Sequence, residues 1–289
     1  MSEMMGQYIL TVTCASARGQ IAAISRFLDE NSCYISELAQ FDDTGSGRFF
    51  VRCRFRGEPD VTPPVQQLRQ AFADGPAARF EMEWAIHDPA LRPRVLILVS
   101  RFDHCLNDLL YRHRTGELHM EIPAVVSNHP DLEPLSRWHG IPFVHLPVTP
   151  STKAEQEARL SALIEESGAE LVVLARYMQV LSDAMCARLR GRAINIHHSF
   201  LPGFKGAKPY HRAHERGVKL IGATAHYVTA DLDEGPIIEQ VVERVEHTHT
   251  PEDLIAVGRD SENLALARAV RLYLEHRVFI NGSRTVVFR

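Results

Sequence analysis

Short segments that alternate between apolar and polar residues dominate the N-terminal part of the chain. Residues 8–14, "YILTVTC", and 33–41, "CYISELAQF", alternate as half-buried strands do. Residues 19–31 between them carry apolar side chains at helical spacing. Two further strands are predicted in the same way over 48–55 and 78–86, and a further helix is predicted over 64–73. The order strand-helix-strand-strand-helix-strand is the ferredoxin-like βαββαβ pattern.

A second pattern follows a proline-containing break at 87–94, "HDPALRPR". Short, continuous apolar runs of the kind found in parallel strands buried on both faces occur at 95–100, 124–128, 143–147, 170–175 and 193–197. Helical stretches, notably 103–114 and 152–167, separate the runs. This alternation predicts an open, mostly parallel Rossmann-like sheet with right-handed crossovers.

The order of elements changes after residue 218. Two longer segments, "KLIGATAHYV" and "PIIEQVVERV", are expected to form antiparallel strands. Residues 251–277 are expected to form a long helix, and 278–288 contain an Asn-Gly hairpin signal. We therefore predict an α/β protein with domains at 1–86 and 94–289 that are joined by a linker at 87–93.

Composition narrows the classes of partner and location. The chain has 289 residues, of which 45% are hydrophobic, and its formal net charge is −4, which gives no electrostatic case for nucleic acid or an anionic membrane. The five cysteines are scattered and form no CxxC pair, which favours a reducing compartment. No secretory signal and no run long enough to span a bilayer is present, so a cytoplasmic location is expected.

Two polar residues end the apolar run at 193–197. Asn195 and His197 are one residue apart, so both point to the same face of a strand. Ligand sites of open α/β sheets lie at the carboxyl ends of strands, and an amide beside an imidazole can donate two hydrogen bonds to one developing oxyanion. The alternative is a polar strand end that only caps a loop.

An acidic turn supplies a third group. "ADLDEGPII", residues 230–238, places Asp231, Asp233 and Glu234 before an apolar strand. A carboxylate folded back to His197 would hold the imidazole in place and raise its basicity. The alternative is an ordinary solvated turn.

Other chemistries have weaker support. His198, His211, His214 and His226 could suggest a metal, but their spacing fits no familiar zinc pattern and no HExxH motif occurs. No Gly-rich phosphate loop follows a strand, and Ser199 is not in a GxSxG elbow. We therefore expect catalysis without a metal or cofactor.

The stretches "INIHHSFLPGFKGAKPYHRA" (194–213) and "GATAHYVTADLDEGPII" (222–238) closely resemble the formyltransferase-type family that handles 10-formyltetrahydrofolate. The resemblance covers about residues 94–289 and implies that Asn195, His197 and Asp233 are catalytic. The N-terminal domain resembles an ACT domain, a regulatory and oligomerisation module.

Within that family the layout is most similar to that of the formyltetrahydrofolate deformylases. The resemblance implies hydrolysis of 10-formyltetrahydrofolate to formate and tetrahydrofolate, which supplies formate for purine synthesis and balances the one-carbon folate pool. The loop "SRFDHC", residues 100–105, has no glycine with which to hold a phosphate, which argues against a nucleotide acceptor. A formyltransferase with an amine acceptor and a non-catalytic, ligand-sensing ACT protein remain the alternatives.

The same resemblance implies where the substrate lies. The folate is expected against the apolar side chains of Met178, Val180 and Leu181, and against the turn formed by Ala230, Asp231 and Leu232. The competing interpretation of the apolar residues is ordinary core packing.

The ACT-like domain implies a homo-oligomer and a possible amino-acid effector. Its first turn, "CASARGQ", keeps Gly19 but lacks the acidic residue and the proline that are usual there, so the effector is the weaker of the two implications.

Overall fold

The computed structural model describes residues 6–201 and 209–289, which divide into two compact units. Unit 1 contains the chain up to Leu91 and two C-terminal segments, and unit 2 contains most of the remainder. The C-terminal segments of unit 1 are Glu275–Asn281 and Val286–Arg289, whereas unit 2 consists of Arg92–Leu274 and Gly282–Thr285. Each unit is described by itself.

Unit 1 is a four-stranded antiparallel sheet in the order β2-β3-β1-β4. The strands are β1 (Gln7–Ala15), β2 (Cys33–Asp43), β3 (Arg48–Gly57) and β4 (Glu83–His87). The helices are α1 (Gln20–Glu30), α2 (Val65–Phe72), the π-helical η1 (Ala73–Ala77) and the short α3 (Ala78–Phe80). The strand order confirms the predicted ferredoxin-like fold.

The predicted strand at 78–86 is wrong over its first half. Helical structure continues from α2 through η1 and α3, and the strand begins only at Glu83. Glu81 ends the helix in the left-handed conformation, with a φ of 50°. The alternation of "ARFEMEWAI" is compatible with either structure over so few residues, and packing decides.

The two faces of the unit 1 sheet are covered differently. Leu10, Val12 and Cys14 of β1 pack in a core with residues of α1 and α2. On the other face of the sheet, the ring of Phe50 in β3 contacts the ring of Phe279 from the C-terminal segment, and the ring centroids are 5.9 Å apart. Successive strand residues point to opposite faces, so the segment that closes the chain completes the N-terminal sheet.

A buried arginine joins the same C-terminal segment to the sheet. Arg52 of β3 is 2% exposed, and its Nη1 lies 2.9 Å from Oε1 of Glu37. Its Nε donates to the carbonyl oxygen of Glu275 at 3.1 Å, and Arg277 pairs with Glu37 as well. The sequence-based range 94–289 assigns the C-terminal segment to the second domain, whereas in the structure Glu275–Asn281 and Val286–Arg289 belong to unit 1. The functional division into two domains stays a prediction.

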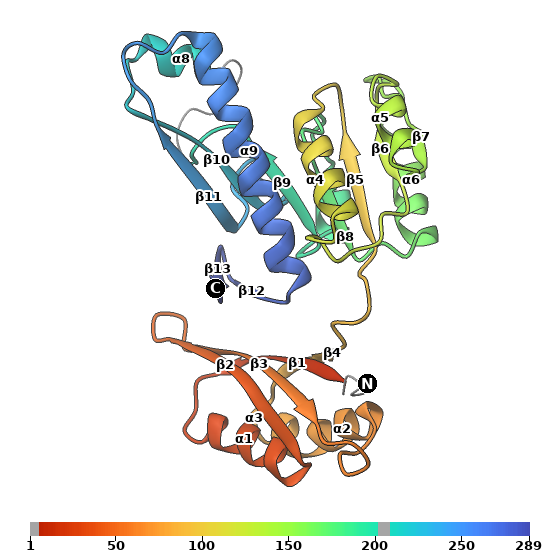
Figure 1. Cartoon of the computed structure of the whole chain (residues 1–289), viewed down its shortest axis with the longest axis vertical. Coiled ribbons are helices and arrows are strands. Elements are labelled where there is room, and N and C mark those ends of the chain that lie inside the picture. The colour runs from red at the N-terminus through yellow and green to blue at the C-terminus, as the bar shows by residue number, and fades with distance from the viewer. Residues whose placement is uncertain (1–5, 202–208) are drawn as a thin grey trace. The chain divides into compact units, whose positions relative to one another are not determined.

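Unit 2 is built on a seven-stranded sheet in the order β11-β10-β9-β8-β5-β6-β7 (Figure 1). Five strands run parallel, namely β5 (Val95–Val99), β6 (Val125–Ser127), β7 (Phe143–His145), β8 (Leu171–Leu174) and β9 (Ala193–His197). The antiparallel strands are β10 (Leu220–Tyr227) and β11 (Ile237–Arg244). Near the chain end, β12 (Val278–Asn281), which belongs to unit 1, forms a separate two-stranded sheet with β13 (Arg284–Val287). The predicted mostly parallel sheet is confirmed.

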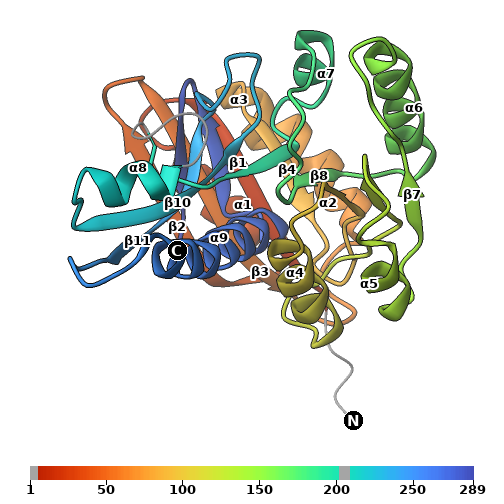
Figure 2. The ribbon, with the colours of Figure 1, turned by 90° about the horizontal axis from the view of Figure 1, so that it is seen from above.

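Helices cover both faces of the unit 2 sheet (Figure 2). Figure 2 shows α4 (His104–Arg114), α5 (Glu133–Trp138) and α9 (Pro251–Leu274) on one side, and α6 (Lys153–Glu166) and α7 (Asp183–Arg188) on the other. One more short helix, α8 (Pro209–Glu215), precedes β10. All five residues of β5 are fully buried, as expected for a strand covered on both faces.

The strand order of unit 2 indicates where a ligand-binding site is expected. The chain forms β6 and β7 on one side of β5, then returns to form β8 and β9 on the other. Ligands of open α/β sheets bind outside the carboxyl ends of the strands at such a reversal.

Residues 202–208, the centre of the Gly-, Pro- and Lys-rich loop after β9, lie outside the described residues. Among the helices of the described part, none combines the length and apolarity needed to cross a bilayer.

Candidate active site

Asn195 and His197 lie at the carboxyl end of β9, as expected. The strand runs between β8 and β10, and its apolar neighbours Ile194 and Ile196 are buried. Alternation therefore directs both polar side chains to one face of the sheet. His197 is 6% exposed, so its ring is held almost entirely inside the protein.

The acidic turn folds back to His197. Nδ1 of His197 and Oδ1 of Asp233 are 3.1 Å apart, although 36 positions separate the two residues along the chain. Burial acts to raise the pKa of Asp233, but the hydrogen bond and charge of His197, together with His226 and His198, hold the pKa below its usual value. Asp233 therefore stays a carboxylate near neutral pH and orients the imidazole of His197.

A third imidazole, which sequence reasoning did not assign to the site, orients Asn195. His226 of β10 pairs with Asn195 across the two strands, and its Nε2 lies 3.2 Å from Nδ2 of Asn195. Its Nδ1 is 2.9 Å from the carbonyl oxygen of Tyr227, which can only accept a hydrogen bond. Nδ1 therefore carries the proton and Nε2 accepts from Asn195.

Burial keeps His226 in that neutral form by lowering its pKa. Because one N–H of the Asn195 amide is used by His226, the other N–H remains for a ligand. Nε2 of His197 is also buried and has no hydrogen-bond partner among the described residues. Two donor-capable nitrogens thus stand side by side at the strand end, which is the arrangement that a developing oxyanion requires.

These groups line a cavity of about 680 Å³ within unit 2. One side of the cavity is apolar and includes Met178, Val180 and Leu232, which are 52%, 56% and 62% exposed. Large apolar side chains at such exposure in a cavity indicate a surface for an apolar part of a ligand.

The remaining predicted folate-contacting residues are placed as follows. Leu181 lines the cavity and is 7% exposed, so it also belongs to the core, and Ala230 lines the cavity in the turn. The backbone N–H of Met178 donates to Oγ of Ser100 at 3.0 Å, which holds the segment after β8 against β5. Asp231 does not contribute to the cavity wall in the described structure, and its carbonyl oxygen accepts from Thr229 instead.

The cavity wall also contains a charged cluster that the sequence analysis missed. Glu262 of α9 is 1% exposed, and both of its carboxylate oxygens are engaged. Nε2 of His104 lies 2.7 Å from Oε2, and the hydroxyl of Tyr210 donates to Oε1 at 2.9 Å. Nε of Arg176 lies 3.4 Å from Oε2 and completes an ion pair. Burial acts to raise the pKa of Glu262, but His104 and Arg176 outweigh it and the pKa is lowered.

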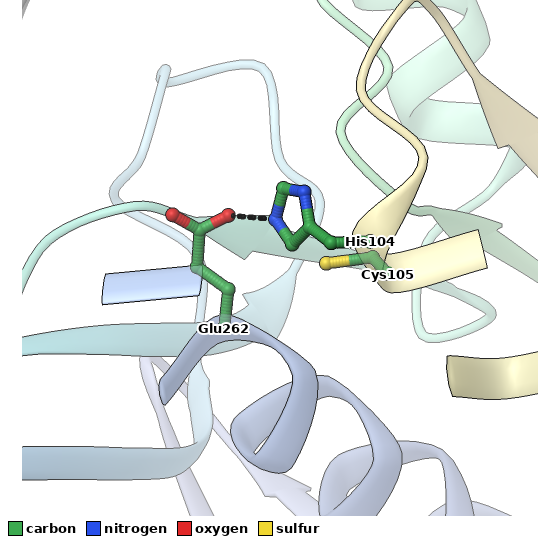
Figure 3. A group of neighbouring side chains, drawn as sticks. All are labelled: His104, Cys105 and Glu262. Carbon is green, nitrogen blue, oxygen red and sulfur yellow. Dashed lines mark hydrogen bonds and ion pairs between the residues drawn. The ribbon is translucent and has the colours of Figure 1, made fainter. Parts of the chain in front are cut away.

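His104, Cys105 and Glu262 could in principle hold a metal ion, because their donor atoms lie within 4.8 Å of one another. Figure 3 shows Glu262 and His104 pointing toward each other with Cys105 beside them. The donor set fits poorly, however. Burial raises the pKa of the Cys105 thiol well above its usual value, and a metal needs the thiolate. The guanidinium of Arg176 already neutralises the carboxylate. Catalysis without a metal stays a prediction.

Comparison with known proteins gives the class of this chain. Residues 93–270 match the family model described as Formyl transferase. That range contains the seven-stranded sheet and every residue of the cavity named above. The chain belongs to the formyl transferase family.

Full-length relatives narrow the class further. A formyltetrahydrofolate deformylase of Corynebacterium sp. (strain P-1) is 52% identical over 291 residues, and 100% of both chains is covered. The crystal structure of a formyltetrahydrofolate deformylase from Burkholderia mallei ATCC 23344 matches with a TM-score of 0.94 and 62% identity, covering 98% of this chain and 100% of that chain. Within the family, this chain groups with the formyltetrahydrofolate deformylases, which confirms the resemblance inferred from the sequence.

A transferase shares the fold of unit 2. The crystal structure of glycinamide ribonucleotide transformylase 1 from Symbiobacterium toebii matches with a TM-score of 0.64 and 33% identity. The match covers 68% of this chain and 95% of that chain. One scaffold therefore carries proteins named for hydrolysis and proteins named for transfer.

Proposed function

We propose that this chain hydrolyses 10-formyltetrahydrofolate to formate and tetrahydrofolate at the site of Asn195, His197 and Asp233. The oxygen of a water molecule bonds to the formyl carbon, and the bond from that carbon to N10 of the folate breaks. N10 takes up a proton, and the formyl group leaves as formate. Of the alternatives, the deformylase relatives argue against a non-catalytic sensor.

Each of the three residues has a distinct part in this reaction. The free N–H of Asn195 and Nε2–H of a protonated His197 donate to the formyl oxygen, which becomes negative in the tetrahedral intermediate. Asp233 holds His197 through Nδ1 and takes a proton from the attacking water. The observation that carries the proposal is the pairing of His197 with Asp233 at 3.1 Å while its buried Nε2 is left for a ligand.

Alanine substitution of each of the three residues tests the site. We expect Asn195→Ala, His197→Ala and Asp233→Ala each to lower kcat about a hundredfold or more, since each removes an oxyanion donor or a proton acceptor. Formate release from 10-formyltetrahydrofolate without any acceptor is the measurement. Asp131→Ala, which changes an exposed carboxylate away from the cavity, serves as the matched control. Near-normal turnover by folded Asp233→Ala protein would remove Asp233 from the mechanism.

The folate is proposed to lie on the apolar side of the cavity. Met178, Val180, Leu181 and Leu232 offer apolar surface, and Ala230 would contact the ligand mainly through the backbone of its turn. A Val180→Asp variant is expected to raise KM about tenfold or more by placing a charge against the ring system, with a smaller effect on kcat. An unchanged KM would move the folate elsewhere.

Unit 1 is proposed to be an ACT-like module that makes the protein a homo-oligomer. Its edge strand β2 has Tyr34 57% exposed and Leu38 39% exposed, which is apolar surface suited to burial against a second copy. An amino-acid effector would fit the hollow of about 730 Å³ formed by residues 16–22 with Gln40, Asp42 and Phe49. A monomer by light scattering would contradict the first proposal, and the absence of any amino-acid binding by calorimetry would contradict the second.

A cytoplasmic location is proposed from the cysteines. All five thiols are buried and free, and burial raises the pKa of Cys14, Cys33, Cys53 and Cys186. Such thiols are stable in a reducing compartment. Recovery of the protein in an oxidising compartment would contradict this proposal.

A further inference from the structure

We propose that Arg176, paired with Glu262 at the polar side of the cavity, determines that water rather than an amine accepts the formyl group. The inference rests on the proposed function of Asn195, His197 and Asp233. It concerns the choice between the two reactions that this scaffold supports, which depends on what fits beside the formyl carbon.

The backbone of Arg176 is the first observation. Arg176 lies two residues after the buried end of β8 and has a φ of 64°, in the left-handed region that glycine occupies without cost. A long side chain in this conformation is uncommon, and such strained positions concentrate at functional sites. The conformation directs a bulky cation into the cavity wall at a position where glycine would be the unstrained choice.

The surroundings of the guanidinium hold it in that place. It lies over the ring of Phe102, with Cζ 4.9 Å from the ring centroid, and it faces Glu262. The side chain is only 10% exposed, and its Nε has no hydrogen-bond partner among the described residues. His104 and Tyr210 fix Glu262 from two other elements, so the anion that anchors Arg176 cannot move toward solvent.

This cluster borders the proposed catalytic residues. His198 stacks on His197 with ring centroids 5.0 Å apart. Burial first, and then the nearby charges of Arg176 and His197, lower the pKa of His198 to about 4. His198 is therefore uncharged, and it lines the same cavity as His197 and the ion pair.

The proposed position of the folate implies that the acceptor binds next to Phe102 and Arg176. If the folate occupies the apolar side, the nucleophile reaches the formyl carbon from the side of Phe102 and Arg176. An amine acceptor needs room for its carbon skeleton, and a side chain as large as that of Arg176, held in the wall by Glu262 and Phe102, takes up that room. Water is small enough to be admitted.

Transfer of the formyl group to an amine breaks the same bond as hydrolysis and needs no further reactant. The nitrogen of an amine would bond to the formyl carbon, the bond from that carbon to N10 would break, and the proton lost by the amine would be taken up by N10. No further reactant is required, so the same proposed residues can catalyse either outcome, and the wall decides between them.

Two variants that open the wall test the inference. Arg176→Gly removes the guanidinium and relieves the left-handed backbone, and Arg176→Gly with Glu262→Gln also removes the carboxylate that would otherwise be left buried without a cation. Each is incubated with 10-formyltetrahydrofolate and glycinamide, and formate and N-formylglycinamide are quantified together. We expect the ratio of N-formylglycinamide to formate to rise at least about tenfold above that of the unchanged protein.

Two controls make the outcome decisive. Arg190→Gly removes an exposed arginine that is not in the cavity wall and should leave the ratio unchanged. Phe102→Ala leaves the ion pair intact, removes a side chain that is 41% exposed, and should raise the ratio about threefold even if both Arg176 variants fail to fold. An unchanged ratio in folded variants that still release formate would overturn the inference and leave the proposed hydrolysis standing. Loss of both products with intact substrate binding would also overturn the inference, because Arg176 would then be needed for the reaction itself and not for the choice of acceptor.

Discussion

Gly235 shows how a single residue positions the proposed catalytic carboxylate. It follows the acidic turn, where an added Cβ would lie 1.7 Å from the carbonyl oxygen of Tyr227 and 3.1 Å from Nδ1 of His226. The backbone there must therefore approach β10 without a side chain. That approach brings Asp233, two residues earlier, to His197.

We predict that Gly235→Ala will lower both stability and turnover. The clash must push the turn away from β10, which is expected to cost about 1–3 kcal/mol of unfolding free energy. Because Asp233 moves with the turn, kcat should fall at least about tenfold. Denaturant unfolding and formate release measure the two effects. Gly75→Ala, at a position with nothing within 4 Å of the added Cβ, is the control, and an equal effect in both variants would refute the explanation.

At the scale of residues, the sequence identified the site only where a local pattern existed. Asn195 and His197 were predictable because they end an apolar run, and Asp233 because an acidic turn precedes a strand. Their association followed from the family resemblance. His226, Arg176 and Glu262 have no such local signal. His226 meets Asn195 only through the register of β9 and β10, and Glu262 lies on a helix far along the chain.

At the scale of elements, α9 forms one wall of the cavity and carries an unusual glycine. A Cβ added to Gly258 would lie 2.1 Å from Cζ of Tyr210 and 2.2 Å from its hydroxyl oxygen. Glu262 follows one helical turn later and accepts the hydrogen bond of that hydroxyl. The glycine therefore allows the tyrosine ring to lie close to the helix and reach the carboxylate.

We predict that Gly258→Ala destabilises the protein, although the same change in a helix interior usually stabilises by about 1 kcal/mol. The expected loss is about 1–3 kcal/mol, since the ring of Tyr210 is buried and must be displaced. In a Tyr210→Ala background the sign should reverse, because the space is then free. Thermal unfolding of the four proteins in this double-mutant cycle is the measurement, and a stabilising effect in both backgrounds would contradict the role of Gly258.

Elements were predicted well where they are long or continuous in pattern. The parallel strands and α4, α6 and α9 were all anticipated, because burial on defined faces imposes the pattern. The helices α5, α7 and α8 were not, since six or seven residues make too few turns to establish a period. The error at 78–86 has the same cause, a pattern too short to separate strand from helix.

At the scale of the whole molecule, two stacked histidines link β4 to the returning C-terminal segment in unit 1. The rings of His87 and His276 have centroids 3.6 Å apart. Burial lowers the pKa of His87 to about 4, with Arg69 and Arg52 adding to the effect. Burial, His87 and Arg52 lower the pKa of His276 to about 3.

These shifts predict a loss of stability in acid. An unfolded histidine binds a proton near pH 6.5 while the folded pair does not, so the unfolded state holds more protons below that pH and stability falls from about pH 6.5 toward pH 4. His276→Asn cannot be protonated, and asparagine tolerates the φ of 52° at this position. The variant should retain about 1 kcal/mol more of its neutral-pH stability at pH 4.5 than the unchanged protein does.

Urea unfolding at pH 7.5 and pH 4.5 measures this difference. His247→Asn, which changes an exposed histidine, is the control. If both variants lose as much stability in acid as the unchanged protein, the acid sensitivity lies outside the stacked pair.

The return of the chain to unit 1 has a consequence for biosynthesis. A ribosome adds about 5–20 residues per second, so on the order of ten seconds or more passes between the release of Leu91 and the release of Glu275. During that interval Phe50 and Arg52 lack the covering that Phe279 and Glu275 provide in the finished protein. Unit 2 has its complete sheet and α9 before the N-terminal sheet receives its last segment. The part of the protein that is made first is therefore completed last, and the nascent chain has an uncovered sheet face for chaperones to protect.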